Sequence, residues 1–396
     1  MTDFAAIEGD AFRREVRQWL ADNFPPSLKN ASSLTYQTNP DEARANADFC
    51  RWKTLMGESG MGVPTWPKQY GGAGLSTEQA EVFQEEMSQL NAFNPIFGNG
   101  PMMLGPTLLE FGTEEQKLEH LPAIARGESS WCQGFSEPGA GSDLASLKTK
   151  CEDKGDHWLV NGQKVWTSFA NHSDWCFCLV RTDTSVKHTG ISFLLIDMTS
   201  PGIDVRPIEL ISGITHFCEV FFNDVKVPKA NLLGQLNEGW SIAKRLLQHE
   251  RNGLSNVRRA GPDVVDLAKE YVGVDENGQL VDPDLRCRLT THQIRSQAYK
   301  LTLKRISDAE NAGVRSDIAV SVVKNLGACV EQSKSELSVE ILGYRGLGWE
   351  AEGYSDEELA VTRAWLYSKA FSIYGGSHEI QNNITAKRVL NLPSAK

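Results

Sequence analysis

The spacing of apolar residues changes twice along the chain, and this change limits the folds that the sequence can adopt. Up to about residue 128 the apolar residues recur with helical spacing. Between about residues 129 and 236 they alternate in short runs separated by turn residues, which is typical of an antiparallel sheet or barrel. Helical spacing returns at about residue 237. The sequence therefore predicts an α+β multidomain fold with an N-terminal helical domain (1–128), a central antiparallel β-barrel (129–236) and a C-terminal helical bundle (237–396).

Several helix ends can be placed from local signals. An apolar stripe over residues 12–20 has helical spacing, and Pro25-Pro26 follows it as a stop signal. Thr113 has the sequence context of a helix N-cap. Residues 355–358 read Ser-Asp-Glu-Glu, which is the spacing of a capping box. Helices are therefore expected to begin at both of these positions.

The central part contains one strong turn signal. In HWLVNGQKVWTS, two alternating runs flank Asn161-Gly162, which predicts a tight hairpin. No strand pattern leads into a GxGxxG motif, so a dinucleotide-binding α/β domain is not expected.

Composition excludes some classes of partner. The chain has 396 residues, 40% hydrophobic and 23% charged, and can bury a sizeable core. Its net charge of −11, with no basic block, argues against a nucleic-acid partner. No apolar run approaches about 18 residues, so no membrane span is expected. The first residues, MTDFAAIEGDAFRREV, match neither a signal peptide nor a transit peptide, and we expect a cytoplasmic protein.

Neither the cysteines nor the histidines indicate a metal site. The eight cysteines include no CxxC pair, and we expect them to be small apolar residues of the core. Cys176 and Cys178 would share one face of a strand, which is poor geometry for a metal ion. The eight histidines include no HExxH motif, and no GxSxG motif is present. Metal-dependent hydrolysis and covalent acyl transfer are therefore not expected.

Glu250 is the candidate general base. In helical register it lies with Ile242, Leu246 and Leu254 on the apolar face of the pattern that begins near residue 238. Desolvation raises the pKa of a carboxylate towards the range that suits a general base. The alternative is a glutamate at the flank of the stripe that reaches solvent or a distant arginine. Arg251 should point about 100° away around the helix.

Three further segments could bind a ligand. FSEPGAGSD, residues 135–143, can bring its backbone close to a phosphate or to the polar edge of a heterocycle, although it could also be a surface turn. Trp166-Thr167-Ser168 ends a strand and could stack beside a planar ring, or simply pack in the core. Ser377 follows Gly375-Gly376 and could cap a final helix or present free amides to an anion.

Together these segments resemble the acyl-CoA dehydrogenase family. GFSEPGAGSD, NGQKVWTS, FFNDVKVPKANLLG and YGGSHEIQNNITAKRVL occur in the family's order and spacing, and WPKQYGG and FGTEEQK also match. The similarity covers nearly the whole chain. It implies the three-domain fold predicted above, with FAD bound between the barrel and the C-terminal helices.

The resemblance also implies roles for particular residues. Those that match flavin-contacting positions are Gln133, Phe135, Ser136, Trp166, Ser168, Ser377 and Glu379. Ser142 matches a position near the CoA arm, and Arg251 is expected to help bind the substrate.

Two departures from the family pattern are informative. Most members carry the catalytic glutamate in a Tyr-Glu-Gly-Thr-like motif, which here reads Tyr-Gly-Gly-Ser at residues 374–377. In the branch that includes isovaleryl and long-chain enzymes, the glutamate instead precedes an arginine on the long helix, as Glu250-Arg251 does here. The second departure is the lack of an Arg-x-x-Phe-Gly motif at 281–295 together with the partial match at Glu340, which leaves the contact to a neighbour's FAD open. Gly261-Pro262 should kink or end the helix.

The resemblance predicts α,β-dehydrogenation of an acyl-CoA to the trans-2-enoyl-CoA. Glu250 would take the α-proton, flavin N5 would accept the β-hydride, and an electron-transfer flavoprotein would reoxidise the flavin. Gly375 in place of a glutamate leaves space for a branched, long or bulky acyl group. The expected assembly is a homotetramer, a homodimer or an α2β2 complex with a homologous subunit. Two alternatives are a catalytically silent FAD/CoA-binding subunit and a flavin oxidase or monooxygenase on the same fold.

Overall fold

The computed structural model describes residues 2–29, 31, 36, 39–255, 263–313, 319–350 and 352–393. The chain forms two compact units, one made of Met1–Ile208 with Thr215–Ala260 and the other of Glu209–Ile214 with Gly261–Lys396. Each unit is described by itself below. The kink or helix end expected at Gly261-Pro262 lies outside the described residues.

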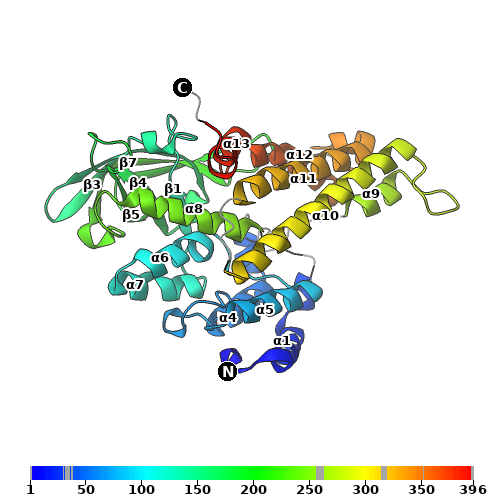
Figure 1. Cartoon of the computed structure of the whole chain (residues 1–396), viewed down its shortest axis with the longest axis horizontal. Helices are drawn as coiled ribbons and strands as arrows, with labels where there is room; N and C mark the ends of the chain where they lie inside the picture. Colours follow the sequence, from blue (N-terminus) through cyan, green and yellow to red (C-terminus); the bar gives the residue numbers. More distant parts are fainter. Residues whose placement is uncertain are drawn as a thin grey trace. The chain divides into compact units, whose positions relative to one another are not determined.

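The N-terminal part of the first unit is helical, as the apolar spacing predicts (Figure 1). Phe12, Val16 and Leu20 form the buried face of the first long helix, which ends before the two prolines. Capping boxes begin two later helices, at Ser76 and at the predicted Thr113. The helices of this part are α1 (Gly9–Asn23), α3 (Pro40–Ala45), α4 (Ala47–Glu58), α5 (Thr77–Gln89), the π-helix η4 (Gly100–Leu104), α6 (Gly105–Phe111) and α7 (Glu114–Ala125). The short 3-10 helices are η1 (Phe4–Ala6), η2 (Pro26–Leu28) and η3 (Lys68–Tyr70).

A seven-stranded sheet follows, with the order β1-β4-β2-β3-β7-β6 and β5 paired with β4. Its strands are β1 (Trp131–Gly134), β2 (Lys150–Asp153), β3 (His157–Ser168), β4 (Trp175–Arg181), β5 (Ile191–Asp197), β6 (Ile203–Ile208) and β7 (Phe217–Pro228). The sheet is mixed, because β1 and β2 both pair with β4 in parallel. The predicted antiparallel pairing is present in β2–β3, β3–β7, β4–β5 and β6–β7, but it was wrong for β1–β4 and β2–β4. Residues 135–174 connect β1 to β4, which is long enough for a parallel crossover.

The hairpin predicted at Asn161-Gly162 was also wrong, because β3 runs without interruption through both residues. The side chain of Asn161 reaches across to β7, where its amide donates to Asp224 Oδ1 at 2.9 Å and its oxygen accepts from Asp224 N at 2.9 Å. A β-bulge lies at this point of the β3–β7 pairing. The Asn-Gly pair therefore lies at a β-bulge between two long strands and does not form a turn.

The last helix of the first unit, α8 (Gly239–Ser255), packs against η4, α6 and β5. The second unit is a helical bundle in which α11 packs against α9, α10, α12 and α13 (Figure 1). The predicted caps at Ser355 and Ser377 are confirmed at the starts of α12 and α13. The helices of the second unit are α9 (Val264–Tyr271), α10 (Pro283–Asn311), α11 (Ala319–Leu342), η8 (Gly343–Leu347), α12 (Asp356–Ser368), η9 (Lys369–Ser372), α13 (His378–Ile384) and the π-helix η10 (Thr385–Val389). The predicted fold class, helical then β then helical, is confirmed.

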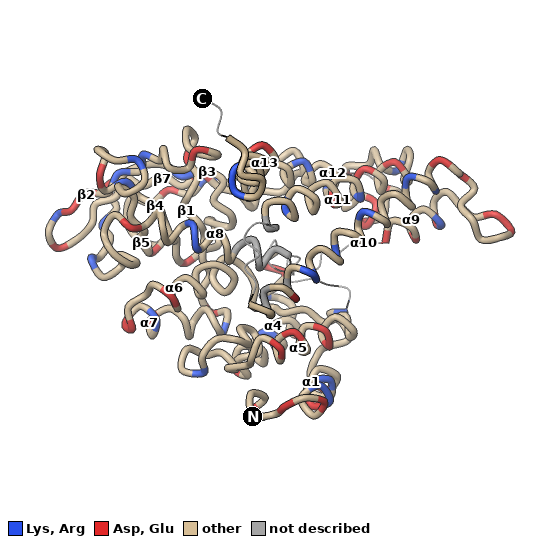
Figure 2. Tube along the Cα trace, viewed as in Figure 1, with Lys and Arg blue, Asp and Glu red and all other residues tan. Residues whose placement is uncertain are grey.

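Acidic and basic residues are interspersed along the trace of each unit (Figure 2). Among the described residues, no helix is both long enough and apolar enough to cross a membrane.

Candidate functional site

The segment that follows β1 carries three of the predicted cofactor-binding residues. Phe135 is buried, and its ring packs edge-on against Phe177 and Phe193, with centroids 5.9 and 6.1 Å away. Its side chain is therefore part of the core, and only its main chain is left for a ligand. Gln133 and Ser136 are half-buried, and the carbonyl of Ser136 accepts the N–H of Val165 from β3.

The glycine-rich loop turns outward next. A pair of main-chain hydrogen bonds joins Glu137 and Ala140, and the residues between and after them are exposed, including Ser142. A methyl group added at Gly139 or Gly141 would meet no atom within 4 Å. The loop therefore presents open backbone to the surroundings, as a ligand-binding loop requires.

Three buried charged residues, in this loop and on the neighbouring strands, were not predicted from the sequence. Lys164 of β3 and Glu137 form an ion pair at 2.8 Å, and Arg181 of β4 donates to main-chain carbonyls. Burial would raise the pKa of Glu137, but Lys164 and hydrogen bonds from Thr149 and Lys148 lower it overall. A lysine within an alternating strand normally indicates the solvent face, so the sequence held no signal for this pair.

The end of β3 has an unusual backbone. Trp166 and Phe169 have φ angles of +60° and +58°, in the left-handed region that non-glycine residues rarely adopt. The indole of Trp166 is 54% exposed and touches Phe217 only edge-on. Ser168 is half-buried beside it, and Thr167 Oγ1 is buried without a hydrogen-bond partner among the described residues. Strained residues of this kind are typical of ligand sites.

Helix α8 carries the predicted base. Its residues Ile242, Ala243 and Leu246 are buried, so the apolar face predicted from the spacing is confirmed up to that point. The backbone is helical through residue 250, but the side chains of Glu250 and Arg251 lie outside the described residues. Their directions and roles stay predictions.

The surroundings of α8 include two features that the sequence did not reveal. One is the π-helix η4, which packs against α8; π-helical turns often occur at functional sites. The other is an ion cluster that ties α8 to α6. Glu110 accepts from Arg245 Nε and Nη2 at 2.8 and 2.6 Å, and His249 Nε2 lies 3.4 Å from the same carboxylate.

In the second unit, Gly375, Gly376 and Ser377 lead into α13. The two glycines have φ angles of +64° and +86°. The hydroxyl of Ser377 accepts the N–H of Ile380, as predicted for a cap. Glu379 is exposed in the first turn, and a hydrogen bond from its own main chain, assisted by Ser377, lowers its pKa. A methyl group at Gly375 would have only Lys324 Cε near it, at 4.0 Å, so there is space beside the main chain.

The two parts of the second departure, near residues 281–295 and 340, meet in the second unit. Arg288 on α10 forms two hydrogen bonds of 2.5 Å with the carboxylate of Glu340 on α11. This pairing lowers the pKa of Glu340. The two side chains therefore neutralise each other within the chain.

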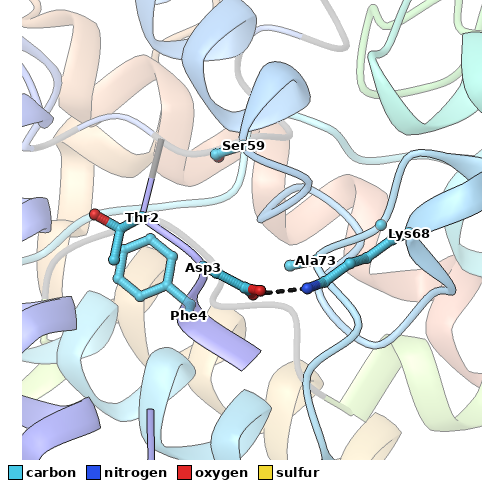
Figure 3. A pocket seen from close by; sticks show the side chains of 7 residues that line it. Thr2, Asp3, Phe4, Ser59, Lys68 and Ala73 are labelled. Atoms are coloured by element: carbon cyan, nitrogen blue, oxygen red, sulfur yellow. Dashed lines mark hydrogen bonds and ion pairs between the residues drawn. The ribbon is translucent and has the colours of Figure 1, made fainter. Parts of the chain in front are cut away.

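Other places in the described parts of the chain offer little. A shallow hollow of about 190 Å³ lies near the N-terminus, where Asp3 pairs with Lys68 at 2.7 Å (Figure 3). It contains none of the predicted site residues. No group of three or more His, Cys, Asp or Glu side chains that could hold a metal ion is found there or elsewhere in the described ranges. The cysteines predicted to lie in the core are buried at 132, 151, 176, 178 and 218, whereas those at 50, 287 and 329 are exposed.

Known proteins share both the sequence and the fold. Models of the acyl-CoA dehydrogenase N-terminal, middle and C-terminal domains match residues 7–128, 132–225 and 237–390. The acyl-CoA dehydrogenase IpdE1 of Mycolicibacterium smegmatis is 37% identical over 405 residues, covering 98% of each chain.

Two solved structures are similar over nearly their whole length. The steroid ACAD Tcur3481-Tcur3483 has a TM-score of 0.79 and 27% identity, covering 100% of both chains. The ChsE4-ChsE5 complex of Mycobacterium tuberculosis has a TM-score of 0.74 and 28% identity, covering 97% of both. The chain therefore belongs to the acyl-CoA dehydrogenase family, whose members are oxidoreductases that act on acyl-CoA.

Proposed function

We propose that this protein oxidises a bulky acyl-CoA thioester to the trans-2-enoyl-CoA, with FAD as cofactor and Glu250 as the base. The observation that carries the proposal is helix α8, whose buried residues Ile242 and Leu246 lead in helical register to position 250. This is the position at which one branch of the family carries its catalytic glutamate. The other usual position is occupied by Gly375, which has no side chain to act as a base.

The residues at the end of β3 fit the flavin that the family generally binds. A planar ring needs an aromatic surface beside it and polar groups at its edge. Trp166 supplies a half-exposed indole, and Ser168 a half-buried hydroxyl. The open main chain around Gly139 and Gly141 can approach a ligand closely. We propose that Gln133, Ser136 and the main chain of Phe135 also contact the cofactor. For Ser377 and Glu379, the same role rests on the family resemblance alone.

The chemistry assigned to this chain is proton removal. The α-proton of a saturated thioester is weakly acidic, so oriented donors must stabilise the negative charge that develops on the thioester oxygen. Glu250 would accept the α-proton, while Ser142 and Arg251 would hold the CoA thioester. Bound FAD would supply the acceptor for the β-hydride. Exclusion of water strengthens each polar contact in such a site.

The proposed acyl group is of steroid type. Tcur3481-Tcur3483 is a steroid ACAD, and it is similar to this chain over its whole length. The space at Gly375 supports a bulky group over a short straight chain. We further propose an electron-transfer flavoprotein as the electron acceptor and a second, homologous subunit as partner, since both of the solved structures described above are named for two proteins.

The test is an anaerobic titration of the purified, FAD-loaded protein with a panel of acyl-CoAs while flavin absorbance is followed. We expect bleaching with bulky, ring-bearing acyl-CoAs and little with short straight chains. Glu250→Gln should bind the same amount of FAD but reduce it at least about 100-fold more slowly, because the base is lost. Glu238→Gln, an exposed position just before α8, is the matched control and should behave as wild type.

Three results would each contradict a part of the proposal. Normal flavin reduction by Glu250→Gln would remove the base assignment. Preference for short straight acyl chains would contradict the proposed substrate class but not the proposed reaction. Rapid reoxidation of the reduced flavin in air would favour the oxidase alternative.

A further inference from the structure

Lys164 is the most deeply buried charged side chain in the central sheet. It is 0% exposed, although it lies on β3 only two residues before the exposed Trp166. Its ammonium donates to Glu137 Oε1 at 2.8 Å and to the carbonyl of Phe135 at 3.1 Å. Both partners belong to the segment between β1 and β2, which we call the 135–149 segment.

Glu137 extends these contacts to the far end of the same segment. Its Oε2 accepts the N–H of Lys148 at 2.6 Å, and its Oε1 accepts the N–H of Thr149 at 2.9 Å. One ion pair therefore joins β3 to the beginning and the end of the 135–149 segment. These are charge-assisted hydrogen bonds, which are shorter and stronger than neutral ones.

Arg181 fixes the part of the segment that the ion pair does not reach. Its guanidinium donates to the carbonyls of Ala145 at 2.6 Å and of Leu147 at 3.2 Å. Held at these points, the segment leaves residues 138, 139 and 141 to 143 exposed, with the two open glycines among them, while Ala140 packs into the core. The exposed part is the part that would face a ligand.

Stability alone is a weak reason for such an arrangement. Two charges removed from water lose their hydration, and a well-packed apolar pair often stabilises a core as well or better. An apolar pair could not hold a carbonyl at Phe135 and two N–H groups at Lys148 and Thr149. The charges are needed to fix the backbone of the segment, and a fixed backbone lowers the entropy lost when a ligand binds.

We infer that Lys164 and Glu137 are positioning residues that hold the 135–149 segment in its ligand-binding conformation before FAD binds. The inference rests on the proposed function, because it takes FAD as the ligand of this segment. Neither side chain is expected to touch the cofactor, since both are buried, Lys164 at 0% and Glu137 at 8% exposed.

The test compares three variants for FAD affinity and thermal stability. Lys164→Met removes the ammonium, and Glu137→Gln is the milder change in case Lys164→Met does not fold. Glu86→Gln is the matched control, because Glu86 is also a buried carboxylate (2% exposed) paired with two arginines, at 2.8 and 2.7 Å, within the N-terminal helices. The apoprotein of each is titrated with FAD, and the visible absorption spectrum of the bound flavin is recorded.

We expect the Kd for FAD to rise at least about tenfold in Lys164→Met and Glu137→Gln, which corresponds to about 1.4 kcal/mol. The spectrum of the flavin that remains bound should shift, because its surroundings are less fixed. Glu86→Gln should lose thermal stability while its Kd and flavin spectrum stay as in wild type.

The opposite pattern overturns the inference. If Glu137→Gln loses as much thermal stability as Glu86→Gln but keeps the wild-type Kd and spectrum, the ion pair is structural only. A wild-type protein that binds no FAD would overturn the proposed function, and this inference with it. Unchanged FAD binding in the variants of a flavin-binding wild type overturns the inference alone.

Discussion

His216 packs between two aromatic rings, with centroids 5.2 Å from Phe169 and 4.3 Å from Phe217. Its carbonyl also accepts the N–H of Phe169, the residue with the second left-handed backbone angle at the end of β3. Burial lowers the pKa of His216 from 6.5 to about 4. The imidazole therefore stays neutral in the folded protein under mildly acidic conditions that protonate it in the unfolded chain.

This shift predicts a loss of stability in acid. Between pH 6.5 and about 4 the unfolded chain binds a proton at His216 and the folded protein does not, so stability falls as pH falls through this window. From about pH 7.5 to about pH 5, the wild type should lose up to roughly 2 kcal/mol more than His216→Phe, which keeps the ring and removes the titration. Denaturant unfolding at both pH values checks this. The exposed His172→Phe is the control, and an equal loss in His216→Phe and wild type would refute the expectation.

At the scale of single residues, the sequence offered signals for candidate ligand-binding residues but none for the buried residues that support them. Trp166, Ser168 and the glycines of the 135–143 loop were predicted as candidates because aromatic, hydroxyl and glycine residues have local signatures. Lys164 has no local signature, because its burial depends on its ion pair with Glu137, which is 27 residues away in the sequence. Long-range pairing of this kind cannot be predicted from spacing within one strand.

At the scale of elements, the bulge of β3 is the feature that local rules misassigned. Asn-Gly favours a hairpin turn in a short peptide segment. Here the pairing with β2 on one side and β7 on the other satisfies the backbone of a long strand, and this outweighs the turn preference. The helix starts at Thr113 and Ser355 were predicted correctly, because their capping bonds join residues three apart.

Gly162 allows a direct test of the bulge. A Cβ at this position would lie 2.5 Å from Thr149 Oγ1 and 2.6 Å from Thr149 Cα, so Thr149, the residue before β2, would have to move. We expect Gly162→Ala to lower the free energy of unfolding by about 1–3 kcal/mol. Gly139→Ala, where an added methyl group meets nothing within 4 Å, should change stability much less. Equal midpoints of denaturation for the two variants would show that Gly162 does not pack this closely against Thr149.

At the scale of the whole molecule, exposed apolar side chains on the second unit suggest an interface. Ile294 and Leu301 lie seven residues apart on α10, on one face, and are 65% and 57% exposed. Tyr344 and Leu347 in η8 are also exposed. Large exposed apolar residues often mark contact sites between proteins. Their partner, in the proposed function, is the second, homologous subunit.

The assembly is tested by co-expression and light scattering. With a homologous subunit present, we expect a complex with more than one copy of this chain. Ile294→Asp combined with Leu301→Asp should reduce the mass of the complex without unfolding the chain, since both side chains are exposed. Gln293→Asp, an exposed polar neighbour, is the control. A chain that stays monomeric alone and with the partner, or a mass unaffected by the double change, would contradict this prediction.

The order of helical, β and helical parts was predictable for the whole chain, because the spacing of apolar residues within each segment indicates its secondary structure. The parallel pairing of β1 and β2 with β4 was not, because it depends on strands brought together from distant positions. The pairing of Arg288 with Glu340 could not be predicted for the same reason. In the sequence, their two regions stood out only as departures from the family pattern.

The unbroken course of β3 constrains how this chain can vary in length. Lys164, Trp166 and Ser168 stand on one strand whose pairing with β7 already shifts register between Lys164 and Thr167, so a further residue inserted or deleted among them would disturb the pairing beyond that point. The turn at 154–156 and the exposed stretch at 184–189 carry no such restriction, since added residues there need not disturb any strand register. Homologues that differ in size should therefore gain or lose residues in those turns while keeping the spacing from 164 to 168 fixed.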